Sequence, residues 1–245
     1  MERASSPVVL KLAHGADLSA ADREVLENLV RDGQRITARQ DLISDGDRPK
    51  FVHVLLEGFA CRYKTLPDGG RQIMALLLPG DFCDLHVAIL GEMDHSIGTL
   101  SPCKVARLGR GAVEELAASQ PRIMRALWWA TLVDEGILRE WIVGMGRRSA
   151  DRQMGHLFCE LLVRLQAVGH ASCDGYDLPI TQNDLGDILG LTPVHVNRVL
   201  QQLRGNGLIT LTGKRLIISD VPELKAFADF NPNYLHLQRR AVTTR

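Results

Sequence analysis

The sequence predicts an α+β protein with three successive parts: an N-terminal antiparallel β sandwich or barrel, a long helix and a C-terminal winged helix-turn-helix. Three observations predict this fold. Short apolar runs separated by turn signals recur at about ten-residue spacing up to residue 110. An unbroken helical apolar pattern follows, and then two capped helical segments joined through a glycine precede a short hairpin.

The composition of the 245 residues limits the class of protein. The chain is 45% hydrophobic and 24% charged, as in globular proteins of one or two domains. No uncharged run exceeds ten residues, whereas a membrane-spanning helix needs about 20 apolar ones. Residues 1–10 lack the continuous apolar run of a secretory signal, so we expect a cytoplasmic protein that has no membrane partner.

The cysteines do not form a recognisable metal or disulfide pattern. They are odd in number and include no C-x-x-C pair, which argues against a disulfide framework, a zinc knuckle or a ligated cluster. We therefore expect no metal site, and thiols that fill apolar space rather than act in redox chemistry. The five are Cys61, Cys83, Cys103, Cys159 and Cys173.

The N-terminal part begins with a helix and continues as strands. Apolar residues at helical spacing behind Ser19 predict an amphipathic helix over 19–32, which Gly33 ends. The turn signal PDGG predicts a hairpin at 66–71. The apolar runs that predict strands lie at 51–56, 59–63, 73–78 and 104–108.

Residues 119–146 predict one long helix with two apolar sides. A stripe that steps by four and three residues runs beside a second stripe, so two surfaces need covering. One side can pack on the β domain, and the other most economically meets a second copy as a parallel coiled coil. The alternative is a single buried helix in a monomer. The residues expected at the dimer contact are Met124, Leu127, Trp128, Thr131, Leu138, Trp141, Ile142 and Met145.

The C-terminal third carries the functional pattern. Thr181 followed by Asp184 is the capping signature of a first helix, and Gly190 ends that helix. Thr192 then caps a second helix, and 207–218 reads as the two short strands of a wing. Between Asp187 and Asp220 the chain has four basic residues and no acidic one, which suits a surface that faces phosphate.

The second helix, over 193–204, presents a polar face opposite its apolar face. Arginine can pair with guanine, glutamine or asparagine with adenine, and valine can touch a thymine methyl group. We expect this helix to enter the major groove of DNA and to read bases through Val194, His195, Asn197, Arg198, Gln201 and Gln202. Phosphate contacts are expected from Thr181, Gln182, Asn183, Thr192, Lys214 and Arg215.

These motifs resemble the Crp/Fnr family of bacterial transcription regulators. The most specific segment is LPITQNDLGDILGLTPVHVNRVLQQLRGNGLI at 178–209, supported by the PGDF turn at 79–82, the long helix and a hinge at 146–151. The resemblance implies a jelly-roll β-roll of the cyclic-nucleotide-binding type. It also implies a homodimer that reads a roughly palindromic promoter site, with RNA polymerase as a further partner.

The same resemblance divides the chain and matches single residues. It implies a sensing β-roll with its N-terminal helix at 1–118, a dimerisation helix at 119–146, a winged helix-turn-helix at 147–220 and a C-terminal extension at 221–245. Arg198 matches the arginine that the family uses against guanine. Val194 stands where the family often has glutamate, so we expect a different preference for DNA sequence.

The resemblance also locates an effector pocket and shows where this chain departs from the family. Members that bind cyclic AMP carry a G-E-L segment, an Arg-Ser pair and hydroxyls near adenine; here those places lack the arginine and the hydroxyls. Cyclic AMP is therefore not expected, and the effector, if the protein needs one, stays open. No iron–sulfur cluster is expected, because the N-terminal cysteine cluster of the oxygen-sensing branch is absent. The matching residues are Cys83, Asp84, Leu85, His95, Ser96, Ile137 and Leu138.

Two other functions are compatible with parts of the pattern. A cupin-type metal enzyme would use the barrel histidines His53, His86 and His95, but such enzymes take two ligands from an H-x-H pair, which this chain lacks. We therefore expect no enzyme. The other alternative is a dimer that binds a small molecule and contacts another protein through its winged helix, with no role in DNA binding.

Overall fold

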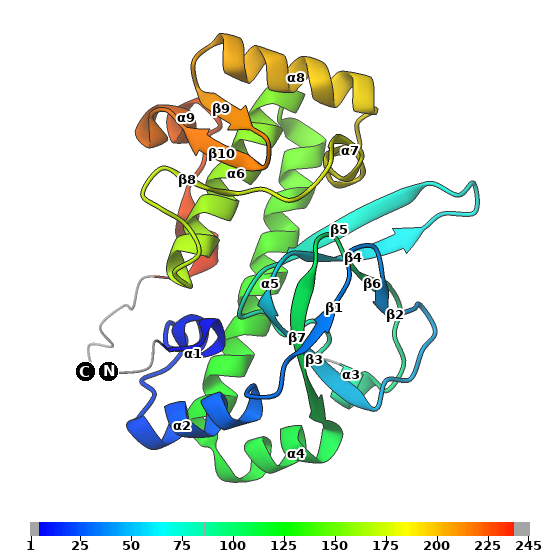
Figure 1. The fold of residues 1–245 in the computed structure, drawn as a ribbon, viewed down its shortest axis with the longest axis vertical. Helices are drawn as coiled ribbons and strands as arrows, with labels where there is room; N and C mark the ends of the chain where they lie inside the picture. Colours follow the sequence, from blue (N-terminus) through cyan, green and yellow to red (C-terminus); the bar gives the residue numbers. More distant parts are fainter. Residues whose placement is uncertain (1–4, 86, 238–245) are drawn as a thin grey trace.

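The structure, a computed structural model, describes residues 5–85 and 87–237. His86 and the basic end of the chain at 238–245 lie outside the described residues. The architecture is the predicted α+β one. Two antiparallel sheets form an N-terminal β-roll, helix α5 runs along it, and the C-terminal helices and a third sheet gather at the far end of α5 (Figure 1).

The β-roll consists of two small antiparallel sheets with strand orders β1-β7-β3 and β2-β6-β4-β5. Alternate side chains from both sheets, such as Leu55, Leu77, Ile97 and Val105, fill the space between them. The four predicted strand runs fall in β3, β4, β5 and β7, and the predicted hairpin joins β4 to β5. The strands are β1 (Gln34–Ile36), β2 (Asp41–Ile43), β3 (Phe51–Glu57), β4 (Ala60–Thr65), β5 (Arg71–Leu77), β6 (Ser96–Thr99) and β7 (Cys103–Gly109).

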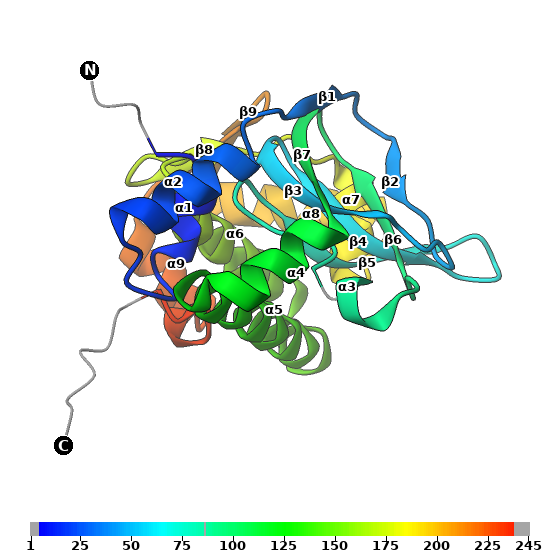
Figure 2. The same ribbon diagram turned by 90° about the horizontal axis from the view of Figure 1, so that it is seen from below.

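Helices surround the lower half of α5 and cover the outer side of β3 and β7 (Figures 1 and 2). The predicted N-terminal helix is α2, where Ser19 and Asp22 form a capping box. Helix α1 was not predicted, and its six residues depend on contacts with this cluster. The helices are α1 (Pro7–Leu12), α2 (Ala20–Leu29), α3 (Val87–Leu90), α4 (Arg110–Ser119) and α5 (Pro121–Arg147).

The C-terminal part contains the helix-turn-helix and a three-stranded sheet with strand order β8-β10-β9. Strands β9 and β10 form the predicted wing, and the 3₁₀ helix η1 closes the described chain. The elements are α6 (Ala150–Ala167), β8 (Gly175–Asp177), α7 (Gln182–Leu189), α8 (Pro193–Gly205), β9 (Ile209–Thr212), β10 (Arg215–Ile218), α9 (Val221–Phe227) and η1 (Pro232–Leu235).

One hydrophobic core extends across the predicted boundary between the two domains. It includes Phe59 and Leu76 of the β-roll together with Leu162 of α6 and Leu200 of α8. The C-terminal extension also returns to α5, where a Cβ atom at Gly136 would lie 3.0 Å from the Tyr234 carbonyl oxygen. The four-part division of the chain remains a prediction, since these contacts tie its parts together.

Helix α5 has one buried and one exposed side. Leu127 was expected at the dimer contact, but it is 1% exposed and packs in the core of its own protomer. Trp141 is also held within the protomer, because its Nε1–H donates to Glu160 Oε2 at 3.1 Å. Met124 is half-buried against the hydrophobic cluster around the lower half of α5. Large apolar side chains remain exposed on the other side: Trp128, Leu132, Leu138, Ile142, Val143 and Met145.

Candidate nucleic-acid interface

Short-range signals build the turn between α7 and α8. The Thr181 side chain accepts from the Asp184 amide and the Asp184 side chain accepts from the Thr181 amide, so both halves of the capping box are present. Gly190 ends α7 with a φ of 67°, which favours glycine. Gly186 is needed for a close approach, because a Cβ atom there would lie 2.6 Å from the Leu191 carbonyl oxygen. Thr192 then caps α8.

Helix α8 presents the predicted reading residues on its accessible side. Val194 is 72% exposed, and Arg198 and Gln201 are exposed. Arg198 forms no ion pair with any residue that the structure describes. Asn197 donates to Gln182 Oε1 at 3.3 Å, and this contact joins the reading face to the start of α7.

Two predicted reading residues lie in other settings. Gln202 is exposed, but its Nε2 donates to Asp151 Oδ2 at 2.9 Å, so its amide is held at the start of α6. His195 is half-buried and its backbone N–H donates to the Thr192 hydroxyl at 3.3 Å. Val194, Arg198 and Gln201 are thus exposed, whereas Asn197 and His195 are both half-buried and Gln202 is held by Asp151.

The predicted phosphate contacts fall into two groups. Residues 181–183 are exposed at the N-terminus of α7, and Thr192 is exposed at that of α8. In the wing, Arg215 donates to Ser172 Oγ at 3.0 Å and lies 3.4 Å from Asp177. Lys214 and Arg215 also line an open cleft of about 550 Å³ between the wing and the β-roll. Lys214 is therefore the more accessible cation of the wing.

Two arginines of the β-roll, which no sequence motif marked, lie beside the start of α7. Arg39 and Arg71 of the β-roll pair with Asp184 and Asp187 of α7. Burial by itself would raise the pKa of Asp184, but hydrogen bonds from Arg39, Thr181 and Arg71 outweigh burial and hold the pKa well below its ordinary value. No local pattern reveals these pairs, because the partners are more than 100 residues apart.

A cavity of about 410 Å³ lies between the β-roll and α5. Three of the seven residues expected at the effector pocket line it: Leu85, His95 and Leu138. Cys83 is buried behind it, and Asp84 accepts hydrogen bonds from the backbone and ring of His53.

The other two expected residues face elsewhere. The Ser96 hydroxyl accepts from the Asp45 amide. Ile137 packs in the core shared with the C-terminal part and lines a different, smaller cavity next to Arg164 of α6.

The cavity contains a cation that no sequence motif marked. Arg62 of β4 lines it, and its Nη2 donates to Asp134 of α5 at 3.0 Å. The same guanidinium donates to the carbonyl oxygens of Phe82 and Cys83 at 3.1 and 3.0 Å. The cavity therefore contains an arginine, although it comes from a different strand than the family pattern suggests.

Among residues 5–85 and 87–237, no group of three or more histidine, cysteine, aspartate or glutamate side chains is placed to hold a metal ion. Within the same residues, no helix combines the length and apolar character that crossing a bilayer requires.

Comparisons with known proteins match both halves of the chain. The model of the cyclic nucleotide-binding domain matches residues 34–120, and that of the Crp-like helix-turn-helix domain matches residues 158–227. The chain is 30% identical over 221 residues to the transcriptional activator protein FnrL of Cereibacter sphaeroides. This alignment covers 87% of this chain and 88% of the relative. It is 28% identical to the nitrogen fixation regulation protein FixK of Bradyrhizobium diazoefficiens, in an alignment that covers 87% of this chain and 88% of the relative.

The fold is also similar to solved structures. FixK2 from Bradyrhizobium japonicum superposes with a TM-score of 0.72 at 24% identity, covering 80% of this chain and 96% of that one. A CooA mutant from Carboxydothermus hydrogenoformans superposes with a TM-score of 0.64 at 16% identity, covering 90% of this chain and 95% of that one. The sequence resemblance is thus confirmed: the chain belongs to the Crp/Fnr family of DNA-binding transcription regulators.

Proposed function

We propose that the protein binds a specific, roughly palindromic DNA site as a homodimer, with α8 of each protomer in a major groove. The observation that carries the proposal is the exposed polar side of α8, which begins at a capped N-terminus and contacts the start of α7 through Asn197 and Gln182. Arg198 is assigned to guanine, Gln201 and Asn197 to other base edges, and Val194 to a thymine methyl group. Gln202 would contribute after leaving Asp151, and His195 would contribute from its half-buried position.

The proposed phosphate contacts surround this reading face. The exposed N-terminus of α7 offers backbone N–H groups and the amides of Gln182 and Asn183 to one phosphate. The Thr181 hydroxyl, which donates to Asp184, would join them after leaving that partner. Thr192 and Lys214 would approach neighbouring phosphates, and Arg215 would join them after leaving Asp177. Because these contacts release counterions, the affinity should fall linearly in a plot of log K against log salt.

The homodimer is proposed to form along the exposed side of α5. This side presents Trp128, Leu138, Ile142 and Met145, with Thr131 at its edge. Two such helices side by side would cover apolar surface that a monomer leaves in water. The two recognition helices would then face successive major grooves of one DNA site.

Control is proposed to act through the cavity between the β-roll and α5. A small molecule there would contact Leu85, His95, Leu138 and Arg62. It would change the orientation of the two recognition helices in the dimer only if it binds one orientation more tightly than the other. We propose that this molecule is not cyclic AMP, since the family's phosphate-binding arginine is replaced by His95. We propose no iron–sulfur cluster and no enzymatic activity. The protein would act in the cytoplasm with RNA polymerase as partner, since FnrL is named a transcriptional activator.

Genomic footprinting of the purified protein at two salt concentrations tests the proposal. Arg198→Ala is expected to lose the footprint while the dimer stays intact, because a bidentate guanine contact is worth about 1–3 kcal/mol in each half-site. Arg107→Ala is the matched control, because Arg107 is an exposed arginine of β7 in the β-roll and takes part in none of the proposed DNA contacts. If Arg198→Ala protects the same sites as the unmodified protein, the assignment of the recognition helix is wrong.

A further inference from the structure

Four charged side chains form a cluster that joins the β-roll to the first helix of the helix-turn-helix. Arg39 donates from both Nη atoms to Asp184 at 2.6 and 2.7 Å. Arg71, the first residue of β5, donates from Nη2 to Asp184 at 2.6 Å and from Nε to Asp187 at 2.7 Å. Both arginines belong to the β-roll and both carboxylates to α7, so we name these four residues the interdomain cluster.

Asp184 takes part in two structures at once. Its Oδ2 accepts from the Thr181 amide at 2.8 Å and from the Thr181 hydroxyl at 2.7 Å, which fixes the start of α7. The same carboxylate accepts the three arginine hydrogen bonds, and its side chain is fully buried. A buried carboxylate is stable only when its charge is paired. The start of α7 is therefore fixed to the β-roll as well as capped.

The cluster also sets the charge beside the proposed phosphate site. Residues 181–183 lie in the turn that Asp184 caps, so an unpaired carboxylate there would repel a phosphate a few ångströms away. In the closed cluster the two arginines balance the two carboxylates. Separation from the β-roll would leave Asp184 and Asp187 uncompensated on the helix that is expected to meet the DNA backbone.

The hairpin that carries Arg71 also reaches the cavity. Met74 and Ala75 of β5 line the cavity, and Arg71 lies three residues earlier on the same strand, about 10 Å away at 3.3 Å per residue. Between them, Gln72 Nε2 donates to the carbonyl oxygen of Ile188 on α7 at 3.5 Å. A displacement of β5 at the cavity would therefore act directly on α7.

We propose that Arg71 and Arg39 are positioning residues for DNA binding. Their hydrogen bonds to Asp184 and Asp187 hold α7 in a fixed orientation and neutralise the two carboxylates. Both effects allow the N-terminus of α7 to bind a phosphate. The closed cluster thus belongs to the DNA-binding state, and the β4–β5 hairpin connects it to the cavity. This inference rests on the proposed function, because it requires that α7 meets the DNA backbone.

A charge swap tests the proposal, because Asp187 takes no part in capping α7. The probe is a DNA duplex that the unmodified full-length protein selects from random-sequence DNA, and Kd is measured by fluorescence anisotropy. Arg71→Glu is expected to weaken binding at least about tenfold. The double variant Arg71→Glu/Asp187→Arg is expected to bind at least about threefold tighter than Arg71→Glu, a partial recovery, because the swap restores the pair between positions 71 and 187 while Asp184 keeps only its hydrogen bonds from Arg39. The single variant Asp187→Arg completes the double-mutant cycle and measures the effect of that substitution by itself.

Controls separate this mechanism from a general loss of charge or of fold. Arg107→Glu makes the same charge change on an exposed arginine of β7 and is expected to bind within about twofold of the unmodified protein. Thermal unfolding and sedimentation are recorded for each variant. If Arg71→Glu unfolds early, Arg71→Gln replaces it, with a smaller loss of about threefold expected.

Several results would overturn the proposal. Unchanged or tighter binding by Arg71→Glu would show that the cluster does not favour the DNA-binding state. A loss that the swap does not repair would show that the Arg71–Asp187 pair is not the cause. If the unmodified protein selects no sequence at all, the proposed function fails instead, so the two failures are distinguishable.

Discussion

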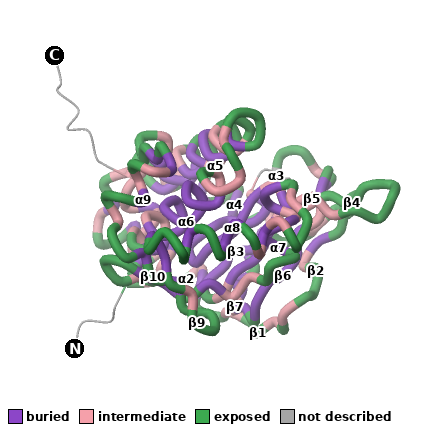
Figure 3. Tube along the Cα trace, turned by 90° about the horizontal axis from the view of Figure 1, so that it is seen from above, coloured by how far each residue is buried: buried purple, intermediate pink, exposed green. Residues whose placement is uncertain are grey.

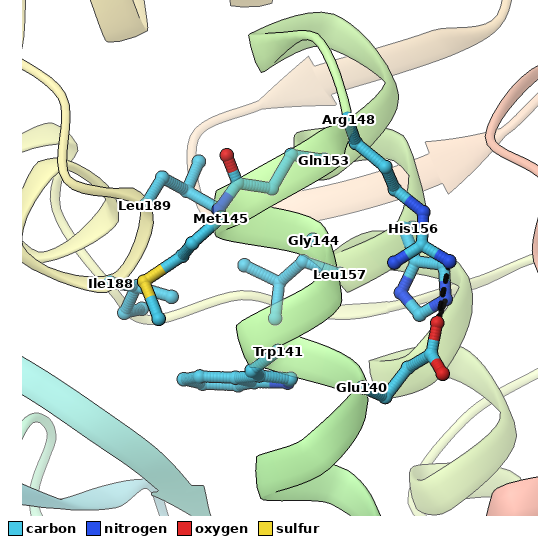
Figure 4. Close-up of a pocket in the computed structure, with 10 residues that line it drawn as sticks. All are labelled: Glu140, Trp141, Gly144, Met145, Arg148, Gln153, His156, Leu157, Ile188 and Leu189. Atoms are coloured by element: carbon cyan, nitrogen blue, oxygen red, sulfur yellow. Dashed lines mark hydrogen bonds and ion pairs between the residues drawn. The ribbon is translucent and has the colours of Figure 1, made fainter.

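His156 lies in a small cavity of about 20 Å³ where α5, α6 and α7 meet at the hinge (Figure 4). Its ring stacks on Tyr234 and meets the edge of Phe230. Its Nε2 lies 3.4 Å from Glu140 Oε1, and Arg148 pairs with the same glutamate. Burial, together with the nearby Arg148 charge, lowers the pKa of His156 to about 4 despite the opposing effect of Glu140. The hinge is therefore built around a neutral imidazole.

This lowered pKa makes stability depend on pH in a defined window. The unfolded chain binds a proton near pH 6.5 and the folded chain only near pH 4, so stability falls as the pH falls through this window. Between pH 7 and pH 5 the loss from His156 should be about 2 kcal/mol. Denaturant unfolding at one protein concentration should show this slope, and His156→Phe should reduce it by that amount. An equal slope in both proteins would contradict the assignment.

The cysteines differ sharply in accessibility. Cys173 is exposed, whereas Cys61, Cys83, Cys103 and Cys159 are buried. Burial raises the pKa of Cys61 and of Cys159 to about 12, and it also raises the pKa of Cys83 and of Cys103. A thiolate is therefore disfavoured at all four buried positions.

Thiol titration of the native protein is accordingly expected to show one fast-reacting cysteine per chain. Cys173→Ser should remove the fast phase, and all remaining thiols should react after unfolding in denaturant. Peptide mapping by mass spectrometry identifies the labelled residue. Fast labelling of Cys83 or Cys103 in the native protein would instead revive a redox role for these residues.

Helix α5 combines two packing tasks along its length. Its buried side contacts the β-roll and α6, while Ile142 is 65% and Trp128 is 71% exposed on the other side. Glu135 and Arg139, four residues apart, form a 2.6 Å ion pair between the apolar groups. Figure 3 shows outer turns of α5 as exposed, so this side is the surface available to a second copy.

A charge in this surface should dissociate the dimer without harming the protomer. Ile142→Glu is expected to weaken dimerisation at least about tenfold, since two carboxylates would be buried near each other in the coiled coil. Leu66→Glu is the matched control, because Leu66 is 50% exposed at the tip of the β4–β5 hairpin. Sedimentation velocity over a concentration series measures both. A dimer of unchanged stability in Ile142→Glu would exclude α5 as the contact.

The β-roll and the C-terminal part share buried charges as well as a core. Arg164 of α6 donates to Glu160, to Asp81 and to the Leu76 carbonyl oxygen at 2.9–3.1 Å. Lys11 of α1 also pairs with Asp81, and Glu160 further accepts from Tyr234 at 2.9 Å. This network connects the start of the chain, the PGD turn, α6 and the C-terminal extension. We therefore expect the β-roll and the C-terminal part to unfold together as one cooperative unit.

Calorimetry tests this coupling. The unmodified protein should show one transition, whereas Arg164→Leu removes the cation that pairs with buried Glu160 and leaves Asp81 with Lys11 alone, at a cost of about 3–5 kcal/mol. The midpoint should fall by roughly 10 °C, and the transition should broaden or split as the two parts separate. Arg107→Leu, which replaces an exposed arginine packed on the Phe51 ring, is the control. One transition at an unchanged midpoint in Arg164→Leu would show that the network does not couple the two parts.

The sequence predicted the elements that depend on neighbouring residues. Thr181, Gly190 and Thr192 determine where α7 and α8 begin and end, because caps and left-handed glycines act within a few residues. The long helix was predicted by its repeating apolar positions, and the β4–β5 hairpin by its PDGG turn. Strands β1, β2 and β6, with three or four residues each, and helix α1 were not predicted, since such short segments carry too little periodic pattern.

The sequence by itself thus determined the family and the helix-turn-helix, because the motifs that reveal them are local, while the residues assigned to DNA stay predictions. Only the tertiary structure decided which distant side chains meet. The rotation of α5 against the β-roll places Leu138 in the cavity but the adjacent Ile137 in the shared core. Arg39 and Asp184, 145 residues apart, are joined because sheet packing brings the β-roll onto α7. Such contacts depend on how whole elements pack, and no short segment of the chain encodes that packing.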